Sequence, residues 1–308
     1  MNVYRHINEF SSEKNVVLTT GTFDGVHLGH KKIIDQVVQM AQKINGESVL
    51  LTFFPHPRMV LYPESNDLKL LNTIDERLEL LRQTGIDHLI IHPFSMEFSR
   101  ITSLDFVRDI LVNKLNTKKL VIGYDHHFGK NREGSFEHIK EYGPLYGFEV
   151  EEIPAQEIQQ INISSTKIRK SLLIGEIQAA NQFLGYHYFI NGTVVEGSKV
   201  GRQIGFPTAN IEVDEDYKLI PANGVYAVKI KIEDNNYSGM LNIGTRPTIK
   251  EGDVTIEVNI FNFNQEIYNK PICIEFFEKI RNEVKFSELT ELQQQLNHDK
   301  QKVLQLFA

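Results

Sequence analysis

Ten residues near the N-terminus, at positions 21–30, constrain the fold of this chain more than any other stretch. The apolar run 16–18 leads into them, and apolar residues at helical spacing follow over 33–44. The sequence therefore predicts a strand, a tight turn and a helix in succession. Three glycines in the stretch allow the backbone to approach a ligand and to adopt positive φ. Because the start of a helix offers free N–H groups to an anion, we expect this turn to bind phosphate.

Two histidines follow the turn. His27 and His30 are three residues apart, so they share a face if the helix has begun there. Both side chains could simply lie at the surface, or the pair could bind a metal ion. Zinc-binding pairs on a helix usually lie four residues apart, however, and no cysteine is near. Histidines beside a phosphate-binding turn favour nucleotide chemistry instead.

Strand and helix signals alternate through the first half of the chain. The apolar strand patterns lie at 46–54, 87–93 and 119–123. A helical pattern with an N-cap at Thr73 and an apolar stripe including Leu78 and Leu81 lies between two of them. Such alternation predicts a parallel α/β sheet. His56 and Asp125 fall where strands end, at the edge where ligands bind in such sheets. A rigid proline-bounded turn with an incidental histidine is an equal alternative for His56.

Hydroxyl groups gather in a second stretch, residues 163–169, which precedes a helical pattern reaching to about residue 183. Ser164 or Ser165 is a natural N-cap for this helix. Hydroxyls with Lys167 and Arg169 at a helix start can also clamp phosphate. Both interpretations apply to the same residues.

The second half of the chain has strand patterns of period two. These patterns lie at 225–232, 237–243, 254–263 and 272–277. Residues 234–236 are expected to form a hairpin turn, and a closing helix is expected to begin with an N-cap at Ser287. Short strands without intervening helices predict a small antiparallel barrel or sandwich. We therefore expect two domains, at 1–183 and 184–308.

A glycine-rich block at 197–205 carries Lys199 and Arg202 but lacks the Gly-Lys-Ser/Thr of a Walker loop. It runs into Thr208 and Asn210, which are two apart and point the same way on an extended strand. A polar strand end after proline would explain these two residues alone. A hydroxyl and an amide oxygen side by side are also hard ligands suited to Mg²⁺ beside phosphates.

Charge and composition limit the class of protein. The formal net charge is −7 over 308 residues, which argues against a general nucleic-acid binder. The single cysteine, Cys273, excludes an intramolecular disulfide and is expected to be a small packing residue. The sequence shows neither a signal peptide nor an apolar run of about 20 residues. We expect a cytoplasmic protein, without membrane partners, that is a monomer or a weak homo-oligomer.

These motifs resemble those of bacterial bifunctional riboflavin kinase/FAD synthetases. Residues 21–30 contain the His-x-Gly-His signature of nucleotidyltransferases, 52–61 resemble the second motif, and 197–210 resemble the riboflavin kinase signature. The resemblance spans about residues 15–300. It implies a Rossmann-like N-terminal domain that adenylylates FMN and a C-terminal barrel with a terminal helix that phosphorylates riboflavin. ATP and Mg²⁺ serve both reactions, and FMN and FAD are the intermediate and the product.

The resemblance also implies the site residues. His27 and His30 stabilise the transition state of adenylyl transfer, which needs positioning because its nucleophile is already anionic. Glu257 is the base that deprotonates the riboflavin hydroxyl. The other nucleotide- and phosphate-binding residues of the first site are Gly21, Phe23, Asp24, Gly25, His56, Asp125, Ser164, Ser165, Thr166 and Arg169. The ATP- and flavin-binding residues of the second site are Gly197, Lys199, Gly201, Arg202, Gly205, Thr208, Asn210, Arg246, Arg281 and Glu283, and Thr208 and Asn210 also bind the metal.

The sequence departs from the family pattern at four positions. His126 replaces the usual phenylalanine, Asn259 replaces a histidine, and asparagines occupy the later acidic positions 262 and 264. Two alternatives stand beside the bifunctional enzyme, and of these departures only His126 supports the first. One is a kinase whose N-terminal domain is inactive or regulatory, and the other is a non-enzymatic flavin-sensing or nucleic-acid-binding protein.

Overall fold

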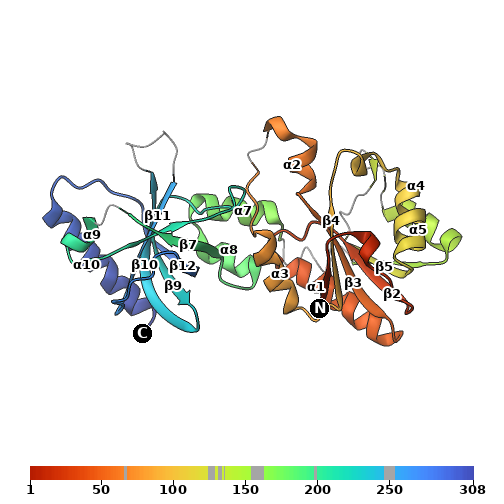
Figure 1. Cartoon of the computed structure of the whole chain (residues 1–308), viewed down its shortest axis with the longest axis horizontal. Coiled ribbons are helices and arrows are strands. Elements are labelled where there is room, and N and C mark those ends of the chain that lie inside the picture. The colour runs from red at the N-terminus through yellow and green to blue at the C-terminus, as the bar shows by residue number, and fades with distance from the viewer. Residues whose placement is uncertain are drawn as a thin grey trace. The chain divides into compact units, whose positions relative to one another are not determined.

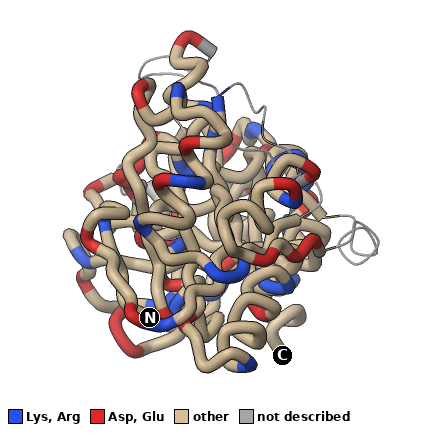
Figure 2. Tube along the Cα trace, turned by 90° about the vertical axis from the view of Figure 1, so that its right-hand side faces the viewer, with Lys and Arg blue, Asp and Glu red and all other residues tan. Residues whose placement is uncertain are grey.

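A computed structural model describes residues 1–65, 68–123, 129–130, 134, 136–153, 163–197, 200–245 and 254–308 of the chain. The chain divides into two compact units, Met1–Ser164 and Ser165–Ala308 (Figure 1). The division falls before the helical stretch that follows Ser164, whereas the change in sequence pattern lies near residue 183. The domain boundary at 183 stays a prediction. Lys and Arg residues are interspersed with Asp and Glu along the described trace (Figure 2).

The first unit contains a six-stranded sheet in the order β1-β4-β3-β2-β5-β6. Its strands are β1 (Asn2–Tyr4), β2 (Val16–Thr20), β3 (Glu47–Phe54), β4 (His88–Pro93), β5 (Thr117–Gly123) and β6 (Glu149–Ile153). Every pair is parallel, which confirms the predicted parallel sheet. All residues of β2 are buried, as expected for a strand covered on both faces. Strand β2 lies between β3 and β5, where the strand order reverses, so the turn after it faces the crevice in which such sheets bind ligands.

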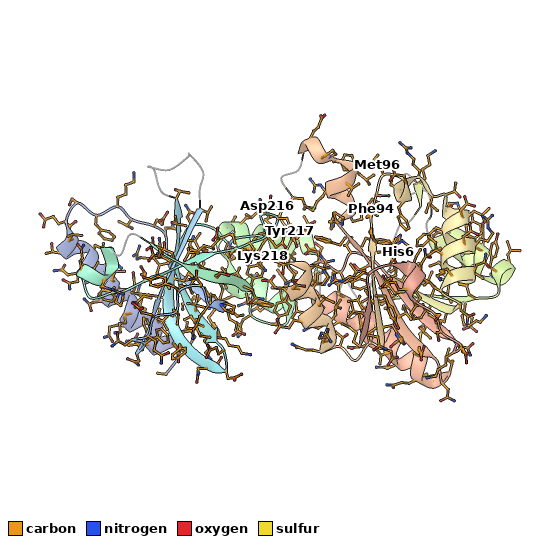
Figure 3. The ribbon with its side chains drawn as sticks, in the orientation of Figure 1. His6, Phe94, Met96, Asp216, Tyr217 and Lys218 are labelled. Atoms are coloured by element: carbon orange, nitrogen blue, oxygen red, sulfur yellow. The ribbon has the colours of Figure 1, made fainter. Side chains whose placement is uncertain are left out.

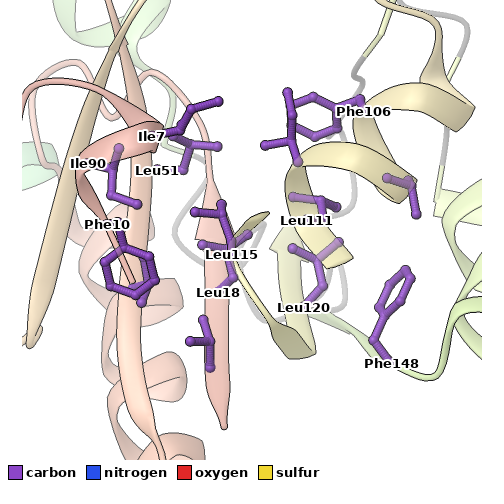
Figure 4. Close-up of a cluster of buried hydrophobic side chains, with 14 of the residues drawn as sticks. Ile7, Phe10, Leu18, Leu51, Ile90, Phe106, Leu111, Leu115, Leu120 and Phe148 are labelled. Carbon is purple, nitrogen blue, oxygen red and sulfur yellow. The ribbon is translucent and has the colours of Figure 1, made fainter. Parts of the chain in front are cut away.

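Helices cover this sheet. They are α1 (Leu28–Lys43), α2 (Pro57–Leu61), α3 (Ile74–Arg82), α4 (Ser103–Asp105) and α5 (Phe136–Tyr146), with a π-helical stretch η4 (Phe106–Lys114) and short 3₁₀ turns at Ile7–Glu9, Pro63–Ser65 and Phe98–Arg100. Apolar residues of η4, among them Phe106 and Leu111, face Leu18, Leu51 and Leu120 of the strands (Figure 4). Residues 103–114 therefore form one helical stretch, made of α4 followed by η4.

Helix α3 shows both a success and an error of the sequence pattern. Thr73 and Glu76 form a capping box, which confirms the predicted N-cap. The buried face, however, consists of Glu76, Arg77, Leu80 and Leu81, and Leu78 is only half-buried. The expected stripe is thus only half right, because Leu81 is buried, whereas much of the buried face consists of two charged side chains in polar contacts that hydrophobic spacing does not reveal.

The second unit is built around a closed antiparallel barrel in the order β10-β11-β8-β7-β12-β9. Its strands are β7 (Phe189–Val195), β8 (Ala209–Glu212), β9 (Gly224–Ile232), β10 (Asn235–Thr245), β11 (Val254–Ile260) and β12 (Pro271–Arg281). The structure confirms the predicted barrel. In the β9–β10 hairpin, Ile232 pairs with Asn235, so Glu233 and Asp234 form the turn, not residues 234–236. Glu233 adopts φ 54°, which permits this tight reversal.

In the described part of this unit, four helices accompany the barrel: α7 (Ser165–Ile174), α8 (Ile177–Leu184), α9 (Val200–Gln203) and α10 (Leu289–Leu306). Val303 of α10 packs in a cluster with Phe206, Val225 and Met240. The N-cap of α10 is Glu288, one residue later than predicted, because Ser287 instead bonds the Glu291 carboxylate through its N–H and hydroxyl.

The segment before β9 is anchored by a buried lysine, Lys218, labelled in Figure 3. Its Nζ donates to the Phe189 carbonyl at 2.8 Å and lies 4.5 Å from the centre of the Tyr188 ring. Burial of the ammonium group is thus offset by a hydrogen bond and a cation–π contact.

Each helix among the described residues is too short or too polar to span a membrane.

Candidate active sites

The turn after β2 has an unusual backbone. Phe23, Gly25 and Val26 adopt φ angles of 47°, 89° and 36°. Positive φ is uncommon for residues other than glycine, and a β-branched valine there is an outlier. Such conformations persist where the surrounding structure enforces them, and they gather at functional sites. The predicted tight turn is present. Of its three glycines, only Gly25 adopts positive φ.

His27 and His30 meet at the start of α1. His27 is the N-cap, and its Nδ1 accepts the backbone N–H of His30 at 3.3 Å. The two rings are stacked, with centroids 3.6 Å apart, and the Phe23 ring lies 5.0 Å from that of His30. The expected common face is therefore present, with His27 just outside the helix.

The environment of His30 keeps its ring neutral. Its Nδ1 is enclosed and has no hydrogen-bond partner among the described residues. Burial, followed by the nearby His27 and Arg77, holds the pKa of His30 well below its ordinary value. A neutral ring at neutral pH can still donate one N–H to a ligand.

Two buried charged side chains, Asp24 and Arg77, link the turn to the start of α3. Asp24 accepts the backbone N–H groups of Leu71, at 2.9 and 3.1 Å to its two oxygens, and of Asn72 at 3.3 Å. Arg77 of α3 donates from Nη1 to the Thr22 carbonyl at 2.9 Å. These contacts hold the turn against the segment that leads into α3. Arg77 was not predicted, although its place beside the leucine stripe of an amphipathic helix is visible in the sequence.

His56 lies at the C-terminal end of β3, as expected. Its Nδ1 accepts the Arg58 N–H at 3.1 Å and caps α2, with Pro57 in the first helical position. The proline-bounded turn is therefore present, while binding of a nucleotide by His56 stays a prediction. Asp125 lies outside the described residues. Ser165, Thr166 and Arg169 open α7 directly after Ser164, and their phosphate contacts also stay predictions.

A second histidine at this sheet edge, His92 near the end of β4, was not predicted. It is 6% exposed, and its ring lies 4.5 Å from His6 and 4.7 Å from Phe98 (His6 is labelled in Figure 3). Burial, with a smaller contribution from His6, lowers the pKa of His92 to about 4. His92 is therefore neutral at neutral pH.

The second candidate site lies on one face of the barrel. Glu257 in β11 is directly opposite Asn210 of β8 on one side and Asn242 of β10 on the other. Residues paired in this way project their side chains to the same face. Thr208 donates its hydroxyl to Glu257 Oε2 at 3.3 Å. The barrel thus brings together residues that were singled out in two separate motifs.

The glycine-rich block packs against this group. A Cβ on Gly197 would overlap the Asn210 amide, so any other residue here would force that side chain to move. Gly201 accepts the Phe206 N–H at 2.8 Å, and Gly205 adopts φ 81°. Arg202 is exposed in α9. Lys199 and Arg246 lie outside the described residues.

Of the residues that depart from the family pattern, Asn259 has a hydrogen-bond partner in the structure. Asn259 donates from Nδ2 to the Pro207 carbonyl at 2.6 Å and so fixes the backbone just before Thr208. Asn262 adopts φ 55° in the turn after β11, a conformation that asparagine tolerates. His126 lies outside the described residues.

Arg281 and Glu283 occupy the end of β12 and the loop after it. Arg281 donates to the buried carboxylate of Asp299, whereas Glu283 accepts from Asn223 at 3.2 Å and from Asn242 at 3.5 Å. Glu283 therefore reaches the residue opposite Glu257. Direct binding of ATP or flavin by either residue stays a prediction.

The donor set around Glu257 fits a magnesium ion that arrives with a nucleotide. Thr208 supplies a hydroxyl oxygen, Asn210 an amide oxygen and Glu257 a carboxylate, all on one face. Mg²⁺ prefers such oxygen ligands and is commonly held by few protein groups together with substrate phosphates.

Comparisons with known proteins cover both units. The family model for FAD synthetase matches residues 9–167, and that for riboflavin kinase matches residues 184–307. Proteins described as bifunctional riboflavin kinase/FMN adenylyltransferase are 40% identical in Listeria monocytogenes and 33% identical in Escherichia coli K12. The alignments cover 96% and 100% of this chain and 93% and 98% of those proteins. A Streptococcus pneumoniae crystal structure, described as a macrolide-efflux protein, matches with a TM-score of 0.89 at 32% identity over 97% of both chains.

Proposed function

The chain belongs to the bifunctional riboflavin kinase/FMN adenylyltransferase family, and we propose that its two domains carry out the two reactions of that name in succession. The C-terminal domain, 184–308, phosphorylates riboflavin with ATP to give FMN. The N-terminal domain, 1–183, adenylylates FMN with a second ATP to give FAD and pyrophosphate. The start of the riboflavin kinase match at residue 184 supports this boundary.

The adenylyl transfer is assigned to the turn at 21–30. A phosphate oxygen of FMN attacks the α-phosphorus of ATP, and the bond to pyrophosphate breaks. Since Nδ1 of His27 accepts an amide hydrogen, the proton of the neutral ring resides on Nε2, from which it can be donated to the transferring group. The N–H groups at the start of α1 add to this stabilisation of negative charge.

The phosphorylation is assigned to the face around Glu257. The primary hydroxyl of riboflavin attacks the γ-phosphorus of ATP, its proton passes to Glu257, and ADP leaves. Thr208 holds one carboxylate oxygen and thereby orients the base. Mg²⁺ bound with ATP would be held by Thr208 and Asn210 and would neutralise phosphate charge. The convergence of Thr208, Asn210 and Glu257 is the observation that carries this assignment.

One assay tests the proposal. The purified full chain is incubated with riboflavin, ATP and Mg²⁺, and the flavins are separated by chromatography. We expect FMN to appear first and FAD to follow. FMN without FAD would leave only the kinase, and no conversion by folded protein would reject the proposal.

We place the enzyme in the cytoplasm, as a monomer or weak homo-oligomer. Its substrates are riboflavin, FMN and ATP, and it has neither nucleic-acid nor membrane partners. The net charge of −7 supports the exclusion of nucleic acid.

A further inference from the structure

A fully buried carboxylate lies in the terminal helix of the barrel unit. Asp299 of α10 is 0% exposed, and both of its oxygens accept hydrogen bonds from Arg281 Nε, at 3.1 and 2.9 Å. Arg281 Nη2 lies 2.9 Å from Asp299 Oδ2, and Gln295 donates to Oδ1 at 2.9 Å. The carboxylate is therefore held on several sides by donors, and the pair joins α10 to the end of β12.

The same guanidinium also fixes the chain that leaves the barrel. Arg281 Nη1 donates to the carbonyl of Asn282 at 3.0 Å, and the guanidinium lies 5.9 Å from the centre of the Phe286 ring. The planar, multivalent shape of arginine allows these contacts together with the bond to Asp299. Arg281 thus holds the loop 282–288 at its start and near its end.

This loop carries Glu283 to the Glu257 face. The Glu283 carboxylate accepts from Asn223 and Asn242, and a Cβ on Gly244 would overlap it. Asn242 is directly opposite Glu257 in the β10–β11 register. A continuous set of contacts therefore leads from Asp299 through Arg281 and the loop to the neighbour of Glu257.

We propose that Asp299 is a positioning residue for riboflavin phosphorylation, which acts through Arg281 to hold the loop 282–288 against the Glu257 face. The proposal rests on the kinase function assigned above. Burying two charges is costly, and an apolar pair of similar volume is often as stable or more so. An ion pair at this place is therefore better explained by the geometry that it imposes than by the stability that it adds.

The test compares a single and a double variant. Asp299→Asn removes the charge at constant size, and we expect kcat for FMN formation to fall at least tenfold while FMN adenylylation by the same preparation is unchanged. In the double variant Arg281→Met/Asp299→Leu, the apolar pair should return the melting temperature toward the wild-type value, but kcat should stay low. Lys270→Gln, which breaks the exposed ion pair with Glu233, is the matched control and should change neither reaction.

Two results would overturn the proposal. One is FMN formation by Asp299→Asn within twofold of the wild type. The other is recovery of kcat together with stability in the double variant, which would make the pair purely structural. If the single variant does not fold, the double variant decides through its kcat, provided that its KM values for ATP and riboflavin match the wild type, since Arg281 is itself a predicted ligand-binding residue. A folded wild-type chain that forms no FMN would instead refute the assigned kinase function.

Discussion

The imidazole rings of His27 and His30 are stacked, with planes only 14° from parallel and centroids 3.6 Å apart. The stack forms because His27 caps α1 through the N–H of His30, which holds the two side chains at the same helix end. Because Nδ1 accepts in this bond, a neutral His27 ring carries its proton on Nε2. Local helix capping and the proposed chemistry therefore depend on the same atom pair.

Replacement of His27 can separate capping from catalysis. Asparagine is a favoured N-cap, so His27→Asn should keep the helix start but remove the donating ring. We expect the kcat/KM of FMN adenylylation to fall by about 10²–10³, as when an electrostatic donor is lost. The melting temperature and FMN formation should stay near wild type. Undiminished adenylylation by this variant would remove His27 from the proposed mechanism.

The buried carboxylate of Asp24 is expected to control the geometry of the turn. Asp24→Asn keeps one accepting oxygen but turns the other into an NH₂ group, which removes the charge and one of the two acceptors that the Leu71 and Asn72 N–H groups share. Loss of such buried bonds costs about 1–3 kcal/mol, measurable by urea unfolding. Adenylylation should fall as well, with FMN formation retained. Asp75→Asn, at an exposed position, is the control, and an equal effect of both variants would contradict this role.

Acid should destabilise the first unit through histidines whose pKa values are lowered in the folded state. The pKa of His92 is about 4 when folded, below the ordinary value of 6.5, so the unfolded chain binds more protons between these values. Stability present above pH 6.5 is therefore lost as the pH falls through this window, and about 2 kcal/mol of it should be lost by pH 5. The lowered pKa of His30 acts in the same direction.

Circular dichroism during urea unfolding at pH 7 and pH 5 measures this loss. His92→Leu should remove the His92 share of the pH dependence, whereas the exposed His138→Gln should leave it intact. A pH dependence equal to wild type in His92→Leu would show that His92 is not the responsible group.

Glu257 should be required for one reaction only. Glu257→Gln keeps the size of the side chain and an oxygen for Thr208, but it cannot take the riboflavin proton at neutral pH. We expect FMN formation to fall by about 10²–10⁴, the usual contribution of a general base. Conversion of added FMN to FAD should continue at the wild-type rate. Failure of both reactions in folded protein would contradict the assignment of separate sites.

A side chain at position 197 should move Asn210 away from its place in the second candidate site. In Gly197→Ala the new Cβ would displace the Asn210 amide, a proposed magnesium ligand. We expect the apparent Mg²⁺ requirement of FMN formation to rise several-fold, with adenylylation unaffected. Gly85→Ala is the control because a Cβ there meets nothing within 4 Å, although its φ of 78° adds about 1 kcal/mol of strain. Unchanged Mg²⁺ dependence in Gly197→Ala would argue against Asn210 as a ligand.

Features that depend on neighbouring residues were predictable from the sequence. The strand–turn–helix around 21–30, the N-cap at Thr73 and the alternation of β9 all follow from short-range periodicity and capping. In β9, buried and exposed residues alternate from Val228 to Ile232, whereas the strand is buried throughout from Gly224 to Val228. The family motifs of both candidate sites could also be found from the sequence, because each motif is a short continuous run of residues.

Tertiary structure alone decided which distant residues meet and which charges are buried. Thr208 and Glu257 are 49 positions apart and meet because of barrel register, which local patterns do not encode. The burial of Arg77 and Asp299 likewise depends on partners contributed by other elements, Thr22 and Arg281. Periodicity and capping are set within a few residues of sequence, whereas desolvation of a charge is tolerated only where the complete fold supplies its counterpart.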